Sequence, residues 1–253
     1  MTLPRRTLLI ALPWLIVIAI WYAIAYSGLI NPSLVPTPHR VAARFFQLLT
    51  TARLPVDIAM STERVLLGVA LGIAAAVPAG FVLGWYPNVR LFIDPLMNFF
   101  RALPPIALIP LVIVYFGIGE VAKVVILFYA SFFAGVIVMY EGIAQISPIY
   151  VRVSRTLGAT DGEIFRKVII PLTVPHLLTA LRVALGVAWA TLVASELIAA
   201  QRGLGSLIQN AASFFQLDII YVGIICIGFI ALAMDIALRI VARRLVAWQE
   251  RIA

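Results

Sequence analysis

Apolar runs about as long as a membrane is thick recur along this chain. A helix needs about 20 largely apolar residues to cross the hydrocarbon core of a bilayer. Only 12% of the 253 residues are charged, whereas a soluble domain has about 25%, so this chain has too few charges to cover a globule. The sequence predicts an all-α integral membrane protein with about six transmembrane helices, near 8–26, 61–85, 97–117, 121–140, 176–200 and 218–240.

The chain is expected to form one domain. Neither a repeat of 20–50 residues nor a low-complexity linker interrupts the sequence. We therefore predict a single transmembrane domain over 1–253, with a first span at 8–26, core spans over 61–240 and a polar loop at 148–171.

The stretch 38–54 places apolar residues, Val41, Phe45 and Leu48 among them, on one helical face, with Arg40 and Arg44 off that face. This pattern is typical of an amphipathic helix on the outer membrane surface. An ordinary packed loop helix would show it equally well, so both interpretations stay open.

Small residues recur every four positions in the second span, at Gly68, Gly72, Ala76, Gly80 and Gly84. Such a stripe lets another helix approach closely. It is compatible with packing inside one subunit and with pairing of two subunits.

The third span is interrupted by Pro104, Pro105 and Pro110, and proline kinks a helix because it lacks a backbone donor. In a membrane such breaks occur where protein or a water-filled cavity covers the backbone. The fifth span carries Glu196 beside Ser195, and intramembrane ionisable residues are candidates for function. These observations make Pro104, Pro105, Ser195 and Glu196 candidates for a translocation path or gate.

The other charges in or near the spans have ordinary explanations. Asp235 is one turn from Arg239, so the two are expected to pair. Arg64 is expected to snorkel to the surface or to pair with Glu63 of a neighbour. Arg101 and Arg182 are expected at cytoplasmic helix ends.

The distribution of Lys and Arg predicts the orientation. With the N-terminus inside and six spans, thirteen of the 19 fall on the cytoplasmic side and six on the outer side. Cytoplasmic loops carry the excess of positive charge. Both termini are therefore expected in the cytoplasm, in a multi-pass protein of the inner or plasma membrane, which also places the loop 148–171 inside.

That loop holds a folded polar segment between two apolar spans. Six charges crowd into residues 150–171, and Gly158 divides the segment into two short helices. Thr160 and Glu163 have the spacing of a capping box. Ile164, Phe165, Val168 and Ile169 then form one apolar helical face. We interpret this face as a docking surface for another protein.

Several classes of site are absent from the sequence. The only lysines, Lys123 and Lys167, do not follow glycine, so the Gly-Lys of a Walker A loop is missing and the chain has no nucleotide site of that type. The two histidines lack ligand-spaced partners, no nucleophile stands beside a base, and no basic cluster interleaved with aromatics suggests nucleic acid. We expect no enzymatic activity, metal or cofactor in this chain.

Around the loop the sequence resembles the membrane permease subunit of a binding-protein-dependent ABC importer. The cytoplasmic loop of that family has the pattern Glu-Ala-Ala, three residues, Gly, nine residues, then Ile-x-Leu-Pro. When Gly158 is aligned with the glycine of this pattern, Val168 and Ile170 take the aliphatic positions and Pro171 takes the proline position. The positions of Glu-Ala-Ala are occupied by Arg152-Val153-Ser154. The nitrate/taurine/alkanesulfonate branch is resembled through Pro36-Thr37-Pro38, Asp94-Pro95, Arg101-Ala102-Leu103-Pro104-Pro105, Tyr115-Phe116-Gly117-Ile118-Gly119-Glu120, Leu157-Gly158-Ala159, Ser195-Glu196-Leu197-Ile198-Ala199-Ala200 and Gly203-Leu204-Gly205.

The resemblance implies a type I importer permease fold with cytoplasmic coupling helices. It implies a second copy of this chain, two ABC ATPase subunits that hold ATP and Mg²⁺, and an extracytoplasmic solute-binding protein, with lipid around the spans. The ATPase would contact the coupling loop, and we assign Arg155, Thr156, Leu157, Gly158, Ala159, Asp161, Phe165 and Pro171 to that coupling. The solute would be a small anion such as a sulfonate, taurine or nitrate, or an aromatic or pyrimidine-type compound.

Two other classes of membrane protein remain as alternatives. An ion-coupled secondary transporter needs titratable groups near the midplane, often in internally repeated halves, and the chain has neither a repeat nor a central carboxylate cluster. A structural subunit of a larger complex would explain the glycine stripe but not the capped polar loop.

Overall fold

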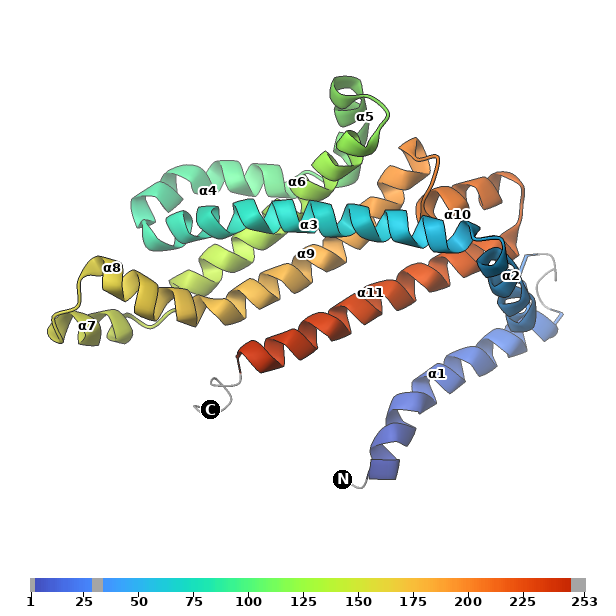
Figure 1. Ribbon diagram of the computed structural model, residues 1–253, viewed down its shortest axis with the longest axis horizontal. Coiled ribbons are helices and arrows are strands. Elements are labelled where there is room, and N and C mark those ends of the chain that lie inside the picture. Colours follow the sequence, from blue (N-terminus) through green and yellow to red (C-terminus); the bar gives the residue numbers. More distant parts are fainter. Residues whose placement is uncertain (1–2, 29–33, 247–253) are drawn as a thin grey trace.

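Figure 1 shows the computed structural model of the chain, which describes residues 3–28 and 34–246. The described residues form helices and no strand, so the all-α prediction is confirmed. In chain order the elements are α1 (Leu3–Tyr26), α2 (Pro38–Thr50), α3 (Arg53–Trp85), α4 (Pro87–Ala102), α5 (Pro105–Phe116), α6 (Glu120–Ala144), α7 (Pro148–Thr156), α8 (Asp161–Ile164), the π-helical turn η1 (Phe165–Ile169), α9 (Ile170–Ala199), α10 (Leu204–Ser213) and α11 (Leu217–Leu245).

The six expected spans correspond to helical segments of the structure. Four are long and apolar enough to cross a membrane: α3, α6, α11 and the helical run Asp161–Ile198, which contains most of α9. The apolar part of α1, Ala11–Tyr26, is shorter. The interruption expected in the third span is confirmed, because α4 and α5 meet there at 90°; the bent pair begins at Pro87, ahead of the expected bounds 97–117.

The core is built on α3 and α6, which lie against each other along the glycine stripe. Each glycine of the stripe faces one residue of α6: Gly68 faces Leu127, Gly72 faces Ser131, Gly80 faces Met139 and Gly84 faces Ile143. A methyl group on Gly72 would lie 2.6 Å from the Cβ of Ser131, far inside van der Waals contact. The stripe therefore serves packing within one chain, and the alternative that it pairs two subunits is excluded.

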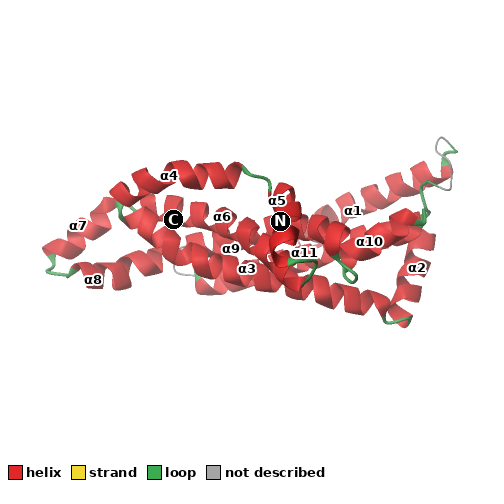
Figure 2. Cartoon of the chain, turned by 90° about the horizontal axis from the view of Figure 1, so that it is seen from above, coloured by secondary structure: helices red, strands yellow, loops and turns green. Residues whose placement is uncertain are grey.

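The remaining helices surround this pair. Helix α9 packs on α6 and α3, and α11 lies along α9. Helix α1 is outermost, and stacked rings join it to α11, Trp14 with Phe229 and Trp21 with Tyr221. In Figure 2, α4 lies along one side of the bundle.

The bundle has two distinct ends. Helices α7 and α8 lie at one end, with the C-terminal ends of α3 and α6; we call this the loop end (Figure 1). Helices α2 and α10 lie at the other end, which we call the opposite end.

At the opposite end, α2 covers the beginnings of α3 and α11. Its apolar face packs inward through the buried Val41 and Leu48, and Arg44 pairs with Asp218 of α11 at 3.2 Å. These contacts favour a packed loop helix over a surface-bound one. The helix expected over 38–54 ends at Thr50, because Ala52, with φ 55°, turns the chain into α3.

Candidate functional site

The polar loop at the loop end has the local structure that its sequence predicts. Helix α7 ends at Thr156, and Gly158 follows with φ 83°, a conformation that favours glycine. Thr160 then caps α8: its hydroxyl accepts a hydrogen bond from the Glu163 amide at 3.4 Å, and the Thr160 amide donates to the Glu163 carboxylate at 3.1 Å. The capping box and the division at Gly158 are confirmed.

The tip of this loop is exposed. Leu157 is 82% exposed, an unusual position for a leucine with no partner chain. Arg155 and Asp161 are also exposed and pair across the turn at 3.0 Å. Thr156 donates its hydroxyl to a carbonyl of the preceding turn, and Ala159 donates its amide to the Ser154 carbonyl at 3.0 Å. The tip is thus held rigid by its own contacts while its side chains face outward.

The apolar face after the cap does not form the free surface that we expected. Ile164 and Ile169 are buried in the chain, at 1% and 2% exposed. Phe165 is half-buried, and its ring contacts those of Phe81 and Trp85 of α3. This face anchors the loop to α3, because an apolar stripe gains most from the nearest apolar surface.

A widened turn joins the loop to α9. In the π-helical turn η1 the Ile170 amide donates to the Phe165 carbonyl, five residues back. Pro171 follows at once and lacks an amide, and its ring would crowd the carbonyl four residues back in a regular helix. The π turn accommodates it without ending the helix. The loop therefore continues into α9 as one helical run, Asp161–Ile198.

Glu196, a candidate from sequence, is buried near the opposite end, at 1% exposed. Its carboxylate accepts hydrogen bonds from Ser61 at 2.8 Å, from Arg64 Nη1 at 2.5 Å and from the Gly205 amide at 2.7 Å. Ser195 is buried beside it, but its hydroxyl donates to the Leu192 carbonyl and takes no part in this cluster. The structure therefore separates the roles of the two neighbours.

Arg64 is the centre of the cluster. Its Nε and Nη2 donate to Glu120 at 2.5 and 2.7 Å, and Lys123 donates to the same carboxylate at 2.8 Å. Arg64 is only 3% exposed. The expectation that it snorkels or pairs with Glu63 of a neighbour is wrong, because carboxylates of α6 and α9 reach it inside the chain. We call Asp57, Ser61, Arg64, Glu120, Lys123 and Glu196 the buried ion network, in which Glu120 is the one member with an exposed side chain.

This network holds the beginning of α10. A helix N-terminus leaves amides without partners, and here side chains from other helices bind them. Asp57 accepts from the Gly203 amide at 3.0 Å, and Ser61 accepts from the Leu204 amide at 2.9 Å. A side chain on Gly203 would collide with Glu196 and Arg64. The motif Gly203-Leu204-Gly205 is therefore explained by close approach of backbone to charged groups.

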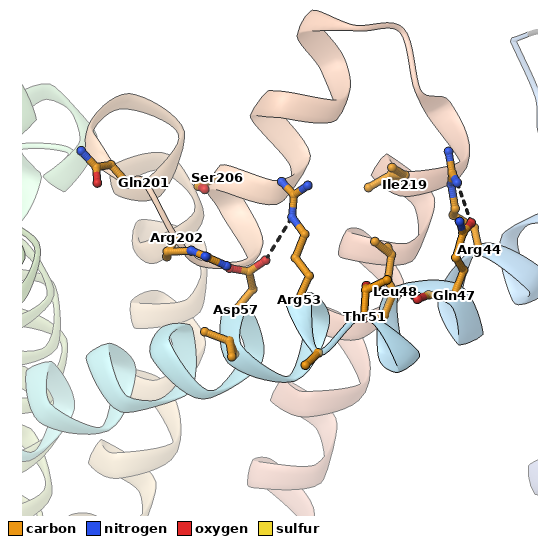
Figure 3. Close-up of a pocket in the computed structure, with 12 residues that line it drawn as sticks. Arg44, Gln47, Leu48, Thr51, Arg53, Asp57, Gln201, Arg202, Ser206 and Ile219 are labelled. Atoms are coloured by element: carbon orange, nitrogen blue, oxygen red, sulfur yellow. Dashed lines mark hydrogen bonds and ion pairs between the residues drawn. The ribbon is translucent and has the colours of Figure 1, made fainter.

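Arginines also line a hollow of about 790 Å³ at the opposite end, shown in Figure 3. Arg44, Arg53 and Arg202 contribute to its wall, together with Gln47 and Gln201. Arg53 faces Asp57 at 3.9 Å, and the Arg202 carbonyl accepts from Arg64 at 2.8 Å. We call this the arginine hollow, and it adjoins the buried ion network directly.

The other two path candidates, Pro104 and Pro105, form the break between α4 and α5. Pro104 caps α5 and Pro105 is its first residue. Since Pro104 has no amide to donate, the Phe100 carbonyl lacks its regular helical partner. That carbonyl instead accepts from the Leu103 amide at 3.2 Å and from the Tyr129 hydroxyl of α6. Arg101, expected at a cytoplasmic helix end, lies at this break.

A separate set of ion pairs, centred on Asp235, joins α9 to α11. Asp235 pairs with Arg239 at 2.7 Å, as its spacing predicts, and also with Arg182 at 2.6 Å. Sequence reasoning missed this second partner, and it also missed Asp57, Ser61, Arg64, Glu120 and Lys123 as members of one network. Opposite charges near the same ends of three predicted spans were the available signal. In the described part of the chain, no three His, Cys, Asp or Glu residues group as metal ligands.

Comparisons with known proteins agree with this architecture. The family described as "Binding-protein-dependent transport system inner membrane component" matches residues 68–247. A probable ABC transporter permease protein of Brucella abortus is 44% identical over 91% of this chain and 91% of its own length. The taurine transport system permease protein of Escherichia coli is 34% identical over 94% and 88%, and the nitrate import permease protein of Synechococcus elongatus 29% over 94% and 86%.

Among solved structures, the methionine ABC transporter in inward-facing conformations matches with a TM-score of 0.68 at 20% identity. The match covers 78% of this chain and 97% of that chain, and supports the type I permease fold. The chain therefore belongs to the family of inner-membrane permease subunits of binding-protein-dependent ABC importers, in the branch of the nitrate, taurine and sulfonate permeases.

Proposed function

We propose that this permease subunit forms the path of an importer for a small anion and is driven by a separate ATPase docked on its loop end. ATP and Mg²⁺ are bound by that ATPase. The loop end and both termini lie in the cytoplasm. The sequence assigns thirteen of the 19 Lys and Arg residues to the cytoplasmic side. Arg101 is not counted among them here, because it lies at the break between α4 and α5, and the other twelve support this orientation.

The contact surface for the ATPase is the exposed tip of the loop. Leu157 supplies an apolar group, flanked by the ion pair of Arg155 and Asp161. Thr156, Gly158 and Ala159 shape the turn between them. Phe165 contributes to coupling because its ring anchors the loop to α3, and Pro171 contributes because it lies in the turn that joins the loop to α9.

One observation carries the mechanism: helix α8 of the loop and Glu196 of the buried ion network lie on a single helical run, Asp161–Ile198. The capped start of α8 and the unbroken turn at Pro171 make this run a lever. When the ATPases close, the lever moves with them. Glu196 at its far end then moves Arg64 and the beginning of α10, and the spans change between inward- and outward-facing arrangements.

Two copies of the chain surround the path, with the apolar surfaces of the outer helices in lipid. A solute-binding protein delivers the solute to the opposite end, where the arginine hollow opens. Relatives named for taurine, aliphatic sulfonates and nitrate support an anionic solute. An aromatic or pyrimidine-type solute is the alternative.

Replacing Gly158 with valine tests this function. A β-branched residue at φ 83° is strained and changes the turn without removing a contact. G158V should abolish solute-stimulated ATP hydrolysis in the reconstituted importer while the complex still assembles. The matched control is Gly162→Ala, in open space at an ordinary φ. Normal turnover by G158V, or crosslinks from residue 160 that never capture an ATPase, would refute the proposal.

A further inference from the structure

The break between α4 and α5 lies about half-way along the bundle. Two contacts fix the register of α4 against α6: the Arg90 guanidinium lies 4.6 Å from the Tyr140 ring centre, and Tyr129 bonds to the Phe100 carbonyl. Ten residues of α4 thus run beside eleven of α6, or roughly 15 Å at 1.5 Å per residue. Arg101 follows Phe100 at once, so its backbone lies close to the level of Tyr129, near the middle of α6 (Glu120–Ala144).

Arg101 is not part of an ion pair. It is exposed, and among the described residues no carboxylate lies within ion-pair distance of it. Asp94, the nearest acid on the same helix, is about two turns away. By contrast, Glu196 pairs with Arg64, and Asp235 pairs with two arginines. Half-way along a span an arginine cannot reach the membrane surface easily, so lipid is a costly neighbour.

The backbone at the break also indicates, independently of the charge, that this part of α4 does not face lipid. Leu103 and Pro104 are not helical, and Pro104 is exposed on the chain. Irregular backbone at membrane depth is tolerated only where protein buries it or where it lines a water-filled cavity. Discontinuous helices near the midplane also mark solute sites in transporters. The side of α4 that carries Arg101 therefore faces the path rather than lipid.

We propose that Arg101 lines the translocation path and binds the negatively charged group of the solute half-way through the membrane. This inference rests on the proposed function, an importer of a small anion. The planar guanidinium donates two parallel hydrogen bonds to two oxygens of one group, which suits a sulfonate or nitrate. Because Arg101 has no carboxylate of its own, it is free to make these bonds.

Uptake by the reconstituted importer, with its ATPase and binding protein, tests the role of the charge. Nitrate, taurine and the neutral pyrimidine uracil are supplied to wild type, Arg101→Gln and Arg101→Lys. R101Q should reduce uptake of the transported anion by about tenfold to a hundredfold, the effect of losing hydrogen bonds to a charged group. R101K should keep more uptake than R101Q. Arg40→Gln, which removes an exposed charge at the opposite end, is the control.

Unchanged anion uptake by R101Q, or normal uracil uptake by both wild type and R101Q, would overturn the proposal. Loss of the dimer in R101Q would also overturn it, because the residue would then be an ion pair between copies. Uptake by wild type that needs no ATPase would refute the proposed function instead.

Cysteine labelling tests the position without knowing the solute. The chain has one cysteine, Cys226, and it is buried, so Arg101→Cys can be made in a Cys226→Ser background. The control is Ile224→Cys, at an exposed position on the apolar surface of α11. The anionic reagent sulfonatoethyl methanethiosulfonate is soluble in water and reaches only thiols that water reaches. It should therefore modify R101C at least about tenfold faster than I224C. Equal, slow modification of the two would place Arg101 outside the path and overturn the inference.

Discussion

Replacing Glu196 with glutamine should destabilise the subunit strongly, although the two side chains have nearly the same shape. Glu196 accepts from Ser61, Arg64 and the Gly205 amide, and all these groups are buried. The amide nitrogen of glutamine can only donate. Wherever it points, it faces one of these donors and leaves that donor without an acceptor.

The size of the destabilisation follows from the loss of the ion pair between Glu196 and Arg64. Removing one partner of a buried ion pair costs about 3–5 kcal/mol, and Arg64 keeps Glu120 as a second partner. We therefore expect the lower end, about 3 kcal/mol. At about 2–4 °C per kcal/mol for a chain of this size, the midpoint of thermal unfolding should fall by roughly 6–12 °C.

Thermal unfolding of the purified subunit in detergent measures this. Asp161→Asn is the control, because it removes the carboxylate of the Arg155–Asp161 ion pair, in which both side chains are exposed, by 60% and 76%. Exposed pairs contribute about 0.2–1 kcal/mol, so D161N should shift the midpoint by no more than a few degrees. Equal shifts for E196Q and D161N would contradict the reasoning that burial gives the Glu196–Arg64 ion pair its strength.

Three further predictions concern separate parts of the chain. Gly72→Val should lower the unfolding midpoint, because α3 and α6 touch there and overpacking costs about 1–3 kcal/mol; Gly186→Val in open space should not, and equal effects would contradict the stripe's role. Thr160→Ala should remove the cap of α8 at a cost of about 1 kcal/mol and reduce coupled ATP hydrolysis without loss of assembly; unchanged coupling would show that the cap is dispensable. Arg202→Glu in the arginine hollow should raise the binding-protein concentration needed for half-maximal ATP hydrolysis, whereas Arg40→Glu outside it should not; identical effects would indicate only general attraction between charges.

The polar loop could be predicted from sequence because its structure is local. A capping box depends on two residues three apart, and Gly158 needs only its own φ. The purpose of the apolar face after the cap could not be predicted. Periodicity shows that such a face will be covered, but the covering surface, Phe81 and Trp85, lies about 80 residues earlier in the chain.

The buried ion network shows the same limit more clearly. Arg64 and Glu196 are 132 residues apart and lie on different spans. Hydropathy places each near a helix end, but it does not give the rotation of one helix about its axis relative to another. An arginine near a span end is therefore equally consistent with snorkelling and with burial. Only the register of α3 against α6, set by the glycine stripe, brings Arg64 beside Glu120.

The position of α8 and Glu196 on one helical run suggests why the network is charged. A motion of α8 that reaches Glu196 must either carry Arg64 and the Gly205 amide with it or break several buried hydrogen bonds at once. Unpaired buried charges cost several kcal/mol each, more than small shifts of apolar contacts. Moving as a unit is therefore the cheaper response. An apolar contact of the same size would allow sliding, so in the proposed mechanism the ion network would make the opposite end move with the helical run.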